Sequence, residues 1–550
     1  MKSLYSKIVD SMQKVLPTEE PGGEEYRKTI LQNERVNFQL CYRNESSTMQ
    51  AITFAKIEVL GELAPFVTIR SVELVSAPFF LQSDAYVISS LPGLYPDPLK
   101  PINCLGVVLP SYQWRAFYVS VENTKGFNPG IYTLRFVLRS HDDKVLSRLS
   151  YQLEILPISA KETDLKITNW MHYDGIESKH GVKLFSKDFY RIFECYLREY
   201  VRGGNNMLFT PLFTPPIDTE IGGERRTAQL IDVRINDNGD YEFCFEKLKC
   251  FCEFVFSHGI KYLEFSHLFT QWGGKFCPKI IAKTNNGETK KLFGWNTRST
   301  SKEYLCFLDV FLTQLVSFIQ DRGWSQKCYF HLTDEPTKAD FGKYKVLYDF
   351  VKKRIGNMSI MDAISHYEIY EKGGIDIPVT ITNKYSFFAN KGIKELFVYY
   401  CCEPRNEFYS NRFLNMPLQR TKIIGMQIFE TGVQGFLHWG FNFYNTARSL
   451  LEVNPYEDTS AGLMFPSGDS FVVYPVQDDV VGSLRLETLG EGLFEYRVLK
   501  TLEDRIGRNK VIKILHKFGI CGYSEYPKNA AAHREVRSKV YALLKKELRN

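Results

Sequence analysis

Long apolar runs are missing from this sequence. Its 550 residues contain no stretch of 18 apolar side chains, the length that a membrane-spanning helix requires, so no membrane span is expected. The first 17 residues are interrupted by Lys7, Asp10 and Lys14 and lack the apolar segment of a secretion signal. We therefore expect a cytoplasmic protein.

Regular cysteine spacing and a strong charge of one sign are missing too. Twelve cysteines in so long a chain do not form a disulfide framework. Cys250 and Cys252 stand too close for the common zinc spacing, and no second Cys/His pair answers them. We expect free thiols, no metal and no cofactor. The net charge of +6 is weak for this length and gives no reason to expect a nucleic-acid partner.

Aromatic residues, by contrast, are plentiful. They make up 14% of the chain, with 32 Tyr and 41 Phe. Such a composition suits clefts that bind flat, partly apolar ligands, although a large aromatic core would explain it equally well. Hydrophobic residues at 44% and charged residues at 24% are ordinary for a globular protein and exclude disorder over most of the chain.

The first third of the chain has the pattern of β-strands. Between residues 26 and 160, apolar and polar residues alternate, as from Val36 to Tyr42, and Gly, Pro and Asn punctuate the ends, as at Asn128-Pro129-Gly130. This pattern predicts an antiparallel β-sandwich, preceded by an extension over residues 1–25. The polar, aperiodic stretch 157–164 predicts a domain boundary.

The rest of the chain alternates short apolar strands with helices. Eight such units predict a (β/α)₈ barrel over residues 161–515, which includes a closing strand at 469–475 and a helix at 486–502. The clearest helix covers residues 301–321, with Thr300 and Glu303 as a capping box. Residues 516–550 form a helical tail that we expect to pack on the outside. The eight predicted strands cover residues 165–171, 207–211, 262–266, 328–332, 359–363, 379–382, 396–401 and 435–439.

Two adjacent carboxylates follow the fourth predicted strand, in the sequence Thr333-Asp334-Glu335-Pro336. Catalytic groups of such barrels lie at the carboxyl ends of the strands. Two close carboxylates in a partly dry cleft resist double ionisation, which leaves a general acid beside an anion, the combination that glycoside hydrolysis needs. Pro336 is expected to hold Glu335 in an extended backbone. The alternative is that Asp334 merely caps the helix that follows.

Other strand ends carry groups suited to a sugar. Aromatic faces can stack on the C–H face of a sugar ring, while carboxylate, amide and imidazole groups bond to its hydroxyls. For each residue alone, a place in the barrel core is the simpler interpretation, and their convergence on one rim favours a binding site. The candidate substrate-binding residues are Tyr173, Asp174, His267, Trp295, Tyr399, Trp439 and Asn442.

Several short segments, in this order and spacing, resemble glycoside hydrolase family 123, whose characterised members are retaining exo-β-N-acetylgalactosaminidases. The resemblance implies a β-sandwich before a catalytic barrel and hydrolysis assisted by the substrate. It implies that Glu335 is the general acid/base and that Asp334 orients the 2-acetamido group, which attacks the anomeric carbon to form an oxazolinium ion. The segments are Asn33 to Gln39, Leu94 to Leu99, Asn128 to Tyr132, Thr333 to Pro336, Gly468-Asp469-Ser470, Tyr474-Pro475, Ser483 to Glu487 and Phe494-Glu495-Tyr496.

The leading hypothesis is therefore a glycosidase that cleaves a terminal β-linked N-acetylhexosamine, foremost N-acetylgalactosamine, from a glycan or glycoconjugate. A second hypothesis is a glycosidase for a sugar without an acetamido group, with Glu264, Glu403 or Glu430 as the nucleophile. A third is a glycan-binding protein without catalysis. The intact Asp334-Glu335 pair argues against the third hypothesis.

Overall fold

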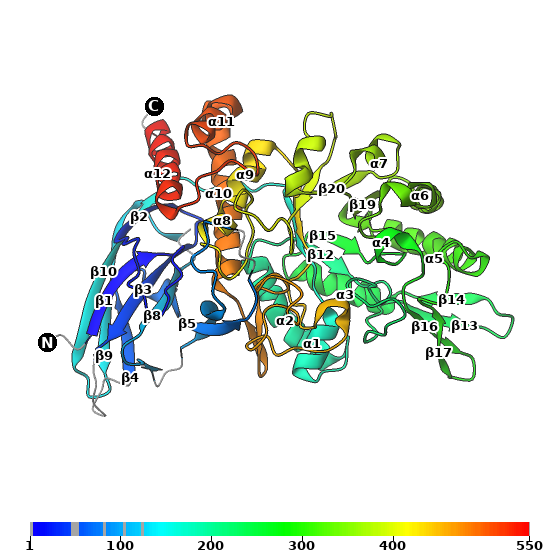
Figure 1. Ribbon diagram of the computed structural model, residues 1–550, viewed down its shortest axis with the longest axis horizontal. Helices are drawn as coiled ribbons and strands as arrows, with labels where there is room; N and C mark the ends of the chain where they lie inside the picture. The colour runs from blue at the N-terminus through cyan, green and yellow to red at the C-terminus, as the bar shows by residue number, and fades with distance from the viewer. Residues whose placement is uncertain (1–3, 46–53, 81–83, 103–105, 123–125, 549–550) are drawn as a thin grey trace.

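The computed structural model describes residues 4–45, 54–80, 84–102, 106–122 and 126–548. It consists of a β-sandwich and a barrel that lie side by side, with the long helix α10 (Leu484–Ile506) running between them (Figure 1). Strand β10 of the sandwich ends at Leu156 and the first barrel strand begins at Lys166. Residues 157–165 therefore connect the two parts.

The sandwich is confirmed, and it reaches further toward the N-terminus than predicted. Residues Leu4–Asp10, which were assigned to an extension, form an edge strand that pairs antiparallel with Val36–Asn44. One pair, β2 with β10, runs parallel within the otherwise antiparallel sheets. Between the sheets, the rings of Phe38 and Tyr151 stack with centroids 3.9 Å apart. The sheets have the orders β1-β3-β8-β5-β6 and β2-β10-β9-β4-β7, with β1 Leu4–Asp10, β2 Arg27–Leu31, β3 Val36–Asn44, β4 Phe54–Leu60, β5 Val67–Ala77, β6 Gly93–Pro101, β7 Val107–Val108, β8 Trp114–Val121, β9 Gly130–Ser140 and β10 Val145–Leu156.

The eight-stranded parallel barrel is confirmed as well. All eight predicted strands are present, and their pairing closes from the last strand back to the first through Thr168 and Leu437. Each strand is short and buried, as expected for a parallel sheet with both faces covered. The barrel order is β11 Lys166–Asn169, β12 Met207–Thr210, β15 Tyr262–Phe265, β18 Cys328–Phe330, β19 Ser359–Ala363, β20 Ile377–Ile381, β21 Phe397–Tyr399 and β22 Gly435–His438.

Helices surround the barrel and cover one side of the sandwich. Most barrel strands are followed by a helix that packs its apolar face on the barrel (Figure 1). The α-helices are α1 Tyr173–His180, α2 Lys187–Arg202, α3 Glu246–Ser257, α4 Gln271–Gly274, α5 Lys302–Asp321, α6 Phe341–Ile355, α7 Tyr367–Glu371, α8 Gln419–Lys422, α9 Ile424–Thr431, α10 Leu484–Ile506, α11 Arg508–Lys517 and α12 Ala530–Glu547.

Helix α5 forms where predicted, but its cap is one residue later. The Ser301 side chain, not Thr300, accepts a hydrogen bond from the backbone N–H of Tyr304. Among the described helices, α5 alone has the length and mean hydropathy (1.2) to cross a membrane. One face of it, including Phe311 and Leu315, is buried in the barrel core, and this packing accounts for its apolar composition.

Two small sheets lie outside the barrel. A four-stranded sheet, in the order β14-β13-β16-β17, is built from the segments that follow β12 and β15, and the sequence pattern did not predict it. The predicted strand 469–475 is wrong for most of its length, because Arg485 and Arg412 bond to the carbonyl groups of Gly468 and Asp469. The strands are β13 Asp232–Ile235, β14 Tyr241–Cys244, β16 Ile280–Thr284, β17 Thr289–Phe293, β23 Tyr474–Val476 and β24 Asp479–Val481.

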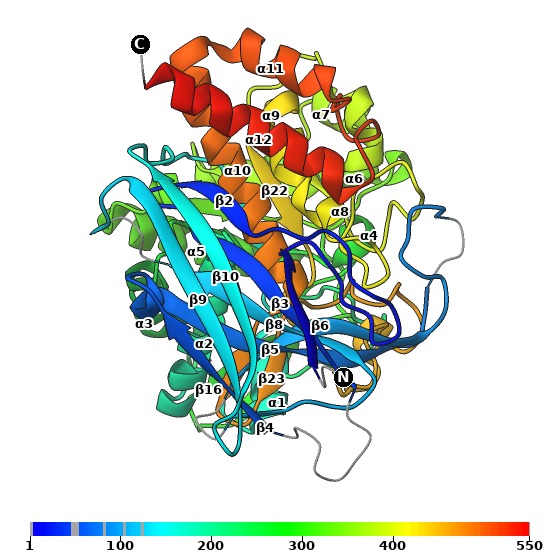
Figure 2. The same ribbon diagram turned by 90° about the vertical axis from the view of Figure 1, so that its left-hand side faces the viewer.

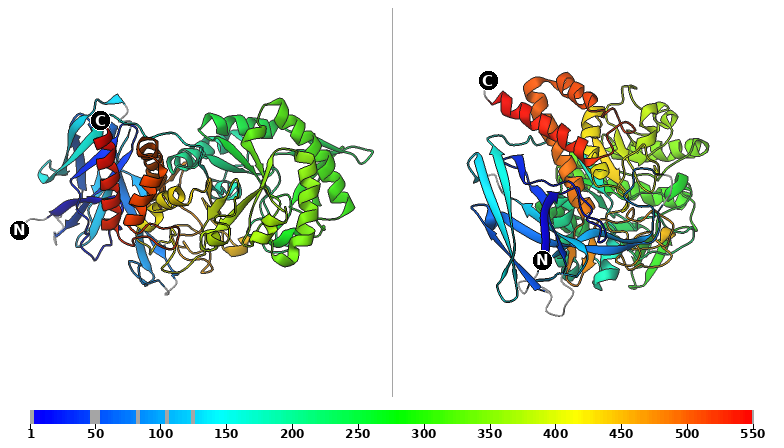
Figure 3. Two further views of the ribbon diagram at one scale, coloured as in Figure 1. Left: turned by 90° about the horizontal axis from the view of Figure 1, so that it is seen from above. Right: turned by 60° about the vertical axis from the view of Figure 1, so that its left-hand side comes forward.

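The C-terminal helix α12 joins the two parts of the molecule. It packs on the outside of the molecule, over β2 and beside α10 (Figures 2 and 3). The Glu34 carboxylate accepts hydrogen bonds from Arg537 at 2.7 Å and from the Tyr541 hydroxyl at 2.6 Å. These contacts tie the end of the chain to the sandwich.

Candidate active site

A cavity of about 190 Å³ opens at the carboxyl ends of the barrel strands, the face where such barrels carry their chemistry. It is smaller than the roughly 300–1,000 Å³ of pockets for drug-sized ligands, and it therefore suits a single ring. Three of its lining residues are carboxylates and three are tryptophans. The lining consists of Trp170, Ile217, Asp218, Gln271, Trp272, Asp334, Glu335, Ala363, Tyr399, Cys401, Cys402, Leu437, Trp439 and Phe465.

The backbone that carries Asp334 and Glu335 is held from the neighbouring strand. Asp362, on β19, accepts hydrogen bonds from the N–H groups of Leu332 at 2.9 Å and Thr333 at 3.4 Å. Glu335 adopts a φ of +44°, in the left-handed region, so the extended backbone expected before Pro336 is wrong. Such a conformation in a non-glycine residue costs on the order of 1–3 kcal/mol and needs support from its surroundings.

Asp334 does not cap the helix that follows, as the alternative interpretation proposed. The next helical turn, Lys338–Asp340, begins after Thr337, whose N–H bonds to the Asp340 carboxylate at 3.2 Å. Asp334 lies three residues before this cap and lines the cavity instead. Its carboxylate is therefore available to a ligand.

Tyr399 orients the exposed carboxylate of Glu335. This tyrosine ends strand β21, and its hydroxyl donates a hydrogen bond of 2.5 Å to Glu335 Oε1. The Tyr399 side chain is itself buried, and burial together with the Glu335 charge raises its pKa well above the usual range. Tyr399 thus remains a hydrogen-bond donor and fixes the rotamer of Glu335 at the cavity.

Asp334 resists ionisation in the cavity without a ligand. Burial and the neighbouring Glu335 charge raise the pKa of Asp334 well above its usual range, with smaller contributions from Asp362 and Asp218. The cation of His331 acts in the opposite direction. Two adjacent carboxyl groups that resist carrying two charges supply one proton donor and one anion.

His331 lies behind this pair, between two further carboxylates. Its Nε2 is 2.5 Å from Glu264 Oε1 and its Nδ1 is 3.1 Å from Asp362 Oδ1, and all three side chains are fully buried. Burial disfavours a cation here, but the hydrogen bonds to Asp362 and Glu264 raise the pKa of His331 to about 9. At neutral pH, His331 is therefore an imidazolium.

The same network reaches the cavity wall through Glu264. Trp170, which lines the cavity, donates its indole N–H to Glu264 Oε1 at 2.7 Å. The Thr168 hydroxyl bonds to the other Glu264 oxygen at 2.5 Å. A single chain of contacts thus connects the wall residue Trp170 with the backbone that presents Asp334.

His267 lies beside this network and, with His331 and Asp362, forms a group of potential metal ligands. Its ligand atom and those of His331 and Asp362 lie within 4.8 Å of one another. The two imidazole rings stack with centroids 4.4 Å apart and planes 25° apart, so their in-plane lone pairs run nearly parallel instead of converging. Both His331 nitrogens already face carboxylates. The trio therefore does not fit a metal ion as it stands.

The cavity brings together four of the nine predicted site residues: Asp334, Glu335, Tyr399 and Trp439. Trp439 is oriented by a 3.0 Å hydrogen bond from its indole N–H to Asp469. Burial raises the pKa of Asp469 to about 7. The segment Gly468-Asp469-Ser470 therefore acts on the cavity through Trp439.

The other five predicted residues do not line the cavity. Tyr173 and Asn442 are buried and bond to the Phe209 carbonyl and to the backbone of His172. Asp174 forms an ion pair with Arg225 at 2.8 Å, and Trp295 contacts Phe276. His267 is buried behind Trp170. Tyr173, Asp174, His267 and Asn442 follow barrel strands closely in the sequence, but their side chains bond or pack within the protein instead of lining the cavity.

The candidate substrate-binding residues leave out several that do line the cavity, although Trp170 and Trp272 are among the aromatic residues at or after the ends of the first and third predicted strands. Trp170 follows the first barrel strand directly, so its position was a usable signal. Trp272 comes from the loop after β15, and its N–H bonds to the Asp334 carbonyl at 2.9 Å. Asp218 lies eight residues beyond the end of β12, where its Oδ2 accepts the Arg448 N–H at 2.9 Å. No local pattern marks a loop residue of this kind.

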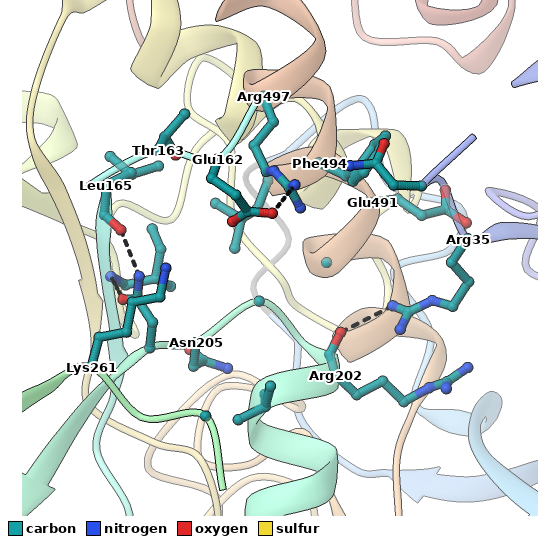
Figure 4. A pocket seen from close by; sticks show the side chains of 18 residues that line it. Arg35, Glu162, Thr163, Leu165, Arg202, Asn205, Lys261, Glu491, Phe494 and Arg497 are labelled. Atoms are coloured by element: carbon teal, nitrogen blue, oxygen red, sulfur yellow. Dashed lines mark hydrogen bonds and ion pairs between the residues drawn. The ribbon is translucent and has the colours of Figure 1, made fainter. Parts of the chain in front are cut away.

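A larger cavity, of about 350 Å³, lies at the opposite end of the barrel (Figure 4). It is enclosed by the starts of barrel strands, by α10 and by the beginning of β3. Several of its charged groups have protein partners: Arg35 bonds to the Arg202 carbonyl at 3.0 Å, and Arg497 pairs with Glu162 (Figure 4). This end of such barrels serves stability rather than catalysis.

Comparisons with known proteins concern the sequence of the barrel region and the overall fold. Residues 170–502 match the sequence model of the glycoside hydrolase 123 catalytic domain. A family 123 glycoside hydrolase from Clostridium perfringens, described in its hydrolysis of glycolipid glycans, superposes with a TM-score of 0.74 at 15% identity, over 100% of this chain and 98% of that one. A β-glucuronidase from Parabacteroides merdae reaches a TM-score of 0.31 at 10% identity, over 89% and 51% of the two chains. No protein with a curated description matches the sequence.

Proposed function

The chain belongs to glycoside hydrolase family 123, and from that premise we propose that it removes a terminal β-linked N-acetylhexosamine from a glycan with retention of configuration. N-acetylgalactosamine is the proposed sugar, and a glycoconjugate is the proposed substrate. The family 123 enzyme from Clostridium perfringens, which hydrolyses glycolipid glycans, supports this choice.

The placement of Asp334 and Glu335 side by side in a cavity for one ring carries the proposal. In the usual retaining mechanism, two carboxylates stand on opposite faces of the scissile bond, about 5–5.5 Å apart. Neighbours on one strand end are poorly placed for that arrangement. A nucleophile within the substrate removes the requirement, and its tethering gives it a high effective concentration.

We assign the proton transfers to Glu335. Its carboxyl group is exposed and is held by the Tyr399 hydroxyl at 2.5 Å. Protonated Glu335 donates to the glycosidic oxygen as the bond to the anomeric carbon breaks. In the second half of the reaction, the Glu335 carboxylate takes a proton from the water that opens the oxazolinium ion.

We assign the orientation of the acetamido group to Asp334. As a carboxylate, Asp334 accepts the N–H of this group, so that the carbonyl oxygen faces the anomeric carbon, and it stabilises the positive charge that develops. Burial and the Glu335 charge raise the pKa of Asp334, so the ionised form that this role requires is favoured when Glu335 holds the proton, and the imidazolium of His331 acts in the same direction. Trp170, Trp272 and Trp439 supply apolar faces for the ring.

The carboxylates first considered as protein nucleophiles lie elsewhere. Glu264 is fully buried in the His331 network, and Glu430 bonds to His516 at 2.9 Å on the outer side of α9. Glu403 is exposed and pairs with Arg405 at 2.8 Å. None of the three lines the cavity.

A second candidate function rests on Asp218, the third carboxylate of the cavity. Because it comes from a different loop, it could face the sugar from another side and act as a protein nucleophile on a sugar without an acetamido group. Asp218→Asn separates the two functions. Under the main proposal this variant keeps most activity and is inhibited by a thiazoline analogue of N-acetylgalactosamine.

The test uses para-nitrophenyl glycosides and a natural-type substrate with a poor leaving group. With the poor leaving group, Glu335→Gln lowers kcat by at least 10²-fold, within the range of general acid catalysis. Asp334→Asn is similarly impaired, and azide does not restore it, because the nucleophile belongs to the substrate. Normal hydrolysis by both variants would refute the proposal, and azide rescue of Asp218→Asn instead would favour the second function.

A further inference from the structure

Two adjacent thiols, Cys401 and Cys402, form part of the wall of the active-site cavity. Their sulfur atoms are 3.9 Å apart, and both side chains are half-buried. They follow the end of strand β21 by two and three residues, and that end is the Tyr399 that holds Glu335. No step of the proposed hydrolysis uses either thiol.

We propose that Cys401 and Cys402 form a reversible dithiol–disulfide site that controls the activity of the cavity. The two sulfurs lie on the same side of the chain and close to each other, and the cavity gives small reagents access to them. Low-molecular-weight disulfides are the oxidants that this site would take.

Metal binding fits the pair less well than oxidation does. A structural zinc ion needs four ligands, and a catalytic one needs three from the protein. Within the described part of the chain, the one group of three His, Cys, Asp or Glu ligands that could hold an ion contains neither cysteine. The pair therefore offers two soft ligands alone, which is the requirement for a disulfide.

The exchange proceeds in two balanced steps. One thiol loses its proton, and the thiolate attacks the small disulfide, whose S–S bond breaks and releases one small thiol. The neighbouring thiolate then attacks the mixed disulfide, which forms the Cys401–Cys402 bond and releases the second small thiol. The protein loses two electrons and two protons, and the small disulfide gains them.

The resulting disulfide should be easily reduced. Neighbouring Cα atoms are about 3.8 Å apart, whereas disulfides usually join Cα atoms about 4.4–6.8 Å apart. The bond therefore forms under strain, and strained disulfides are the labile, regulatory kind. The hydrogen bond with Cys402 and burial raise the pKa of Cys401, so the oxidation should proceed faster as the pH rises.

Oxidation is expected to affect Asp334 and Glu335 through a shift of the backbone beside Tyr399. Closing the S–S bond draws the sulfurs from 3.9 Å to about 2 Å. The flanking backbone is held by hydrogen bonds of 2.8 Å, from Asn411 to the Cys401 carbonyl and from Arg405 to the Cys402 carbonyl. The closure therefore displaces the wall beside Tyr399. A misplacement of about 1 Å in an active site can cost on the order of 10²-fold in rate.

The experiment exposes the full-length protein to oxidised glutathione and then to dithiothreitol. Peptide mass mapping detects the Cys401–Cys402 disulfide without any substrate. Activity is measured on the para-nitrophenyl glycoside that the protein hydrolyses. We expect the disulfide to appear together with at least a 10-fold loss of activity, and dithiothreitol to reverse both.

Two variants make the test specific, each compared with itself before and after oxidation. The activity of Cys402→Ser should change less than 2-fold on oxidation. The activity of Cys306→Ser, which alters an exposed thiol on α5, should fall on oxidation as that of the wild type does. Absence of the disulfide, full activity with the disulfide present, or equal sensitivity of Cys402→Ser would overturn the proposal. A protein without glycosidase activity in which the disulfide forms would instead count against the proposed function.

Discussion

At the scale of single residues, one buried imidazolium organises the catalytic pair. His331 lies between Glu264 and Asp362, while Asp334 lies in front of it and is subject to its charge. Charges within about 4–6 Å shift the pKa of a carboxyl group by about 1–3 units. Because the hydrogen bonds to Asp362 and Glu264 keep His331 charged up to about pH 9, Asp334 has a fixed positive neighbour over the working range. We regard His331 as a positioning residue, since it acts through Asp334.

His331→Gln tests this role. Without the cation the pKa of Asp334 rises further, so the acid limb of the kcat/KM profile should move to higher pH by about one unit. Binding through the aromatic wall should persist, so kcat is expected to fall more than KM rises. His516→Gln removes an exposed histidine that pairs with Glu430, and it should leave the limb unchanged. A folded His331→Gln protein with the wild-type acid limb would contradict the assignment.

The pH dependence of the free energy of unfolding gives a second measure of the His331 charge. A histidine whose pKa is raised on folding stabilises the protein fully below its unfolded value of about 6.5, and this contribution is lost as the pH rises through about 9. The stability difference between the wild type and His331→Gln should therefore shrink between these two pH values.

How well each site residue could be predicted depended on its distance from a strand end in the sequence. Tyr399 and Trp439 lie at or next to the ends of their strands, where the direction of the backbone fixes where the side chains point. Asp334 and Glu335 follow the end of β18 by four and five residues, and the contacts of Asp362 with Leu332 and Thr333 hold the segment before them. His267 and Asn442 are equally close to strand ends in sequence, but they turn into the core. Asp218 is positioned by the Arg448 N–H, a contact between residues 230 positions apart that no local pattern encodes.

At the scale of elements, helices α9 and α10 approach so closely that only glycine fits at the contact. A Cβ on Gly425 would lie 1.7 Å from the Gly492 carbonyl oxygen, and one on Gly492 would lie 2.2 Å from the Lys422 carbonyl oxygen. Helix α10 is the element that separates the barrel from the sandwich (Figure 1). Its distance from α9 therefore decides how the two parts of the molecule pack.

Gly492→Ala should push α10 away from α8, whose last residue is Lys422. We expect a loss of about 3 kcal/mol or more in the free energy of unfolding, because backbone atoms cannot yield to the added methyl group as a side chain could. Gly342→Ala is the matched control: it also lies in a helix, α6, but its Cβ would meet nothing within 4 Å. That change should stabilise the protein by about 0.5–1 kcal/mol. Urea denaturation of both variants gives the comparison, and equal effects would rule out the close-contact explanation.

The elements themselves were predictable to different degrees. The eight barrel strands are short apolar runs, because a parallel sheet buried on both faces leaves no room for polar side chains. The strands of the four-stranded sheet have only four or five residues and include exposed positions, as in Tyr241–Cys244, so they resemble loops in sequence. The cap of α5 is Ser301 and not Thr300, because serine is the more favourable N-cap residue, and the capping-box spacing of Thr300 and Glu303 does not outweigh this preference.

At the scale of the whole molecule, segments far apart in sequence meet between the sandwich and the barrel. Asp97 on β6, Tyr474 on β23 and Arg485 on α10 form one buried cluster, in which Arg485 pairs with Asp97 at 2.7 Å and the Tyr474 hydroxyl donates to Asp97 at 2.7 Å. Arg485 also bonds to the Gly468 carbonyl, next to the Asp469 that orients Trp439 in the cavity. Four of the eight short segments that carry the family resemblance therefore meet here, those that contain Asp97, Gly468, Tyr474 and Arg485, and they connect the sandwich to the active site.

Asp97→Ala tests how far this cluster holds the two parts together. Both Asp97 and Arg485 are buried, so removing the carboxylate leaves an unpaired guanidinium away from water, a change that typically costs about 3–5 kcal/mol. The loss should lower the temperature of the whole unfolding transition in calorimetry, because the cluster belongs to the sandwich and to the barrel at once. Asp504→Ala, which removes an exposed partner of Lys161, should change little. Since Arg485 supports the turn beside Asp469, Asp97→Ala should also raise KM. If Asp97→Ala and Asp504→Ala have the same unfolding temperature and the same KM, the cluster does not couple the sandwich to the barrel.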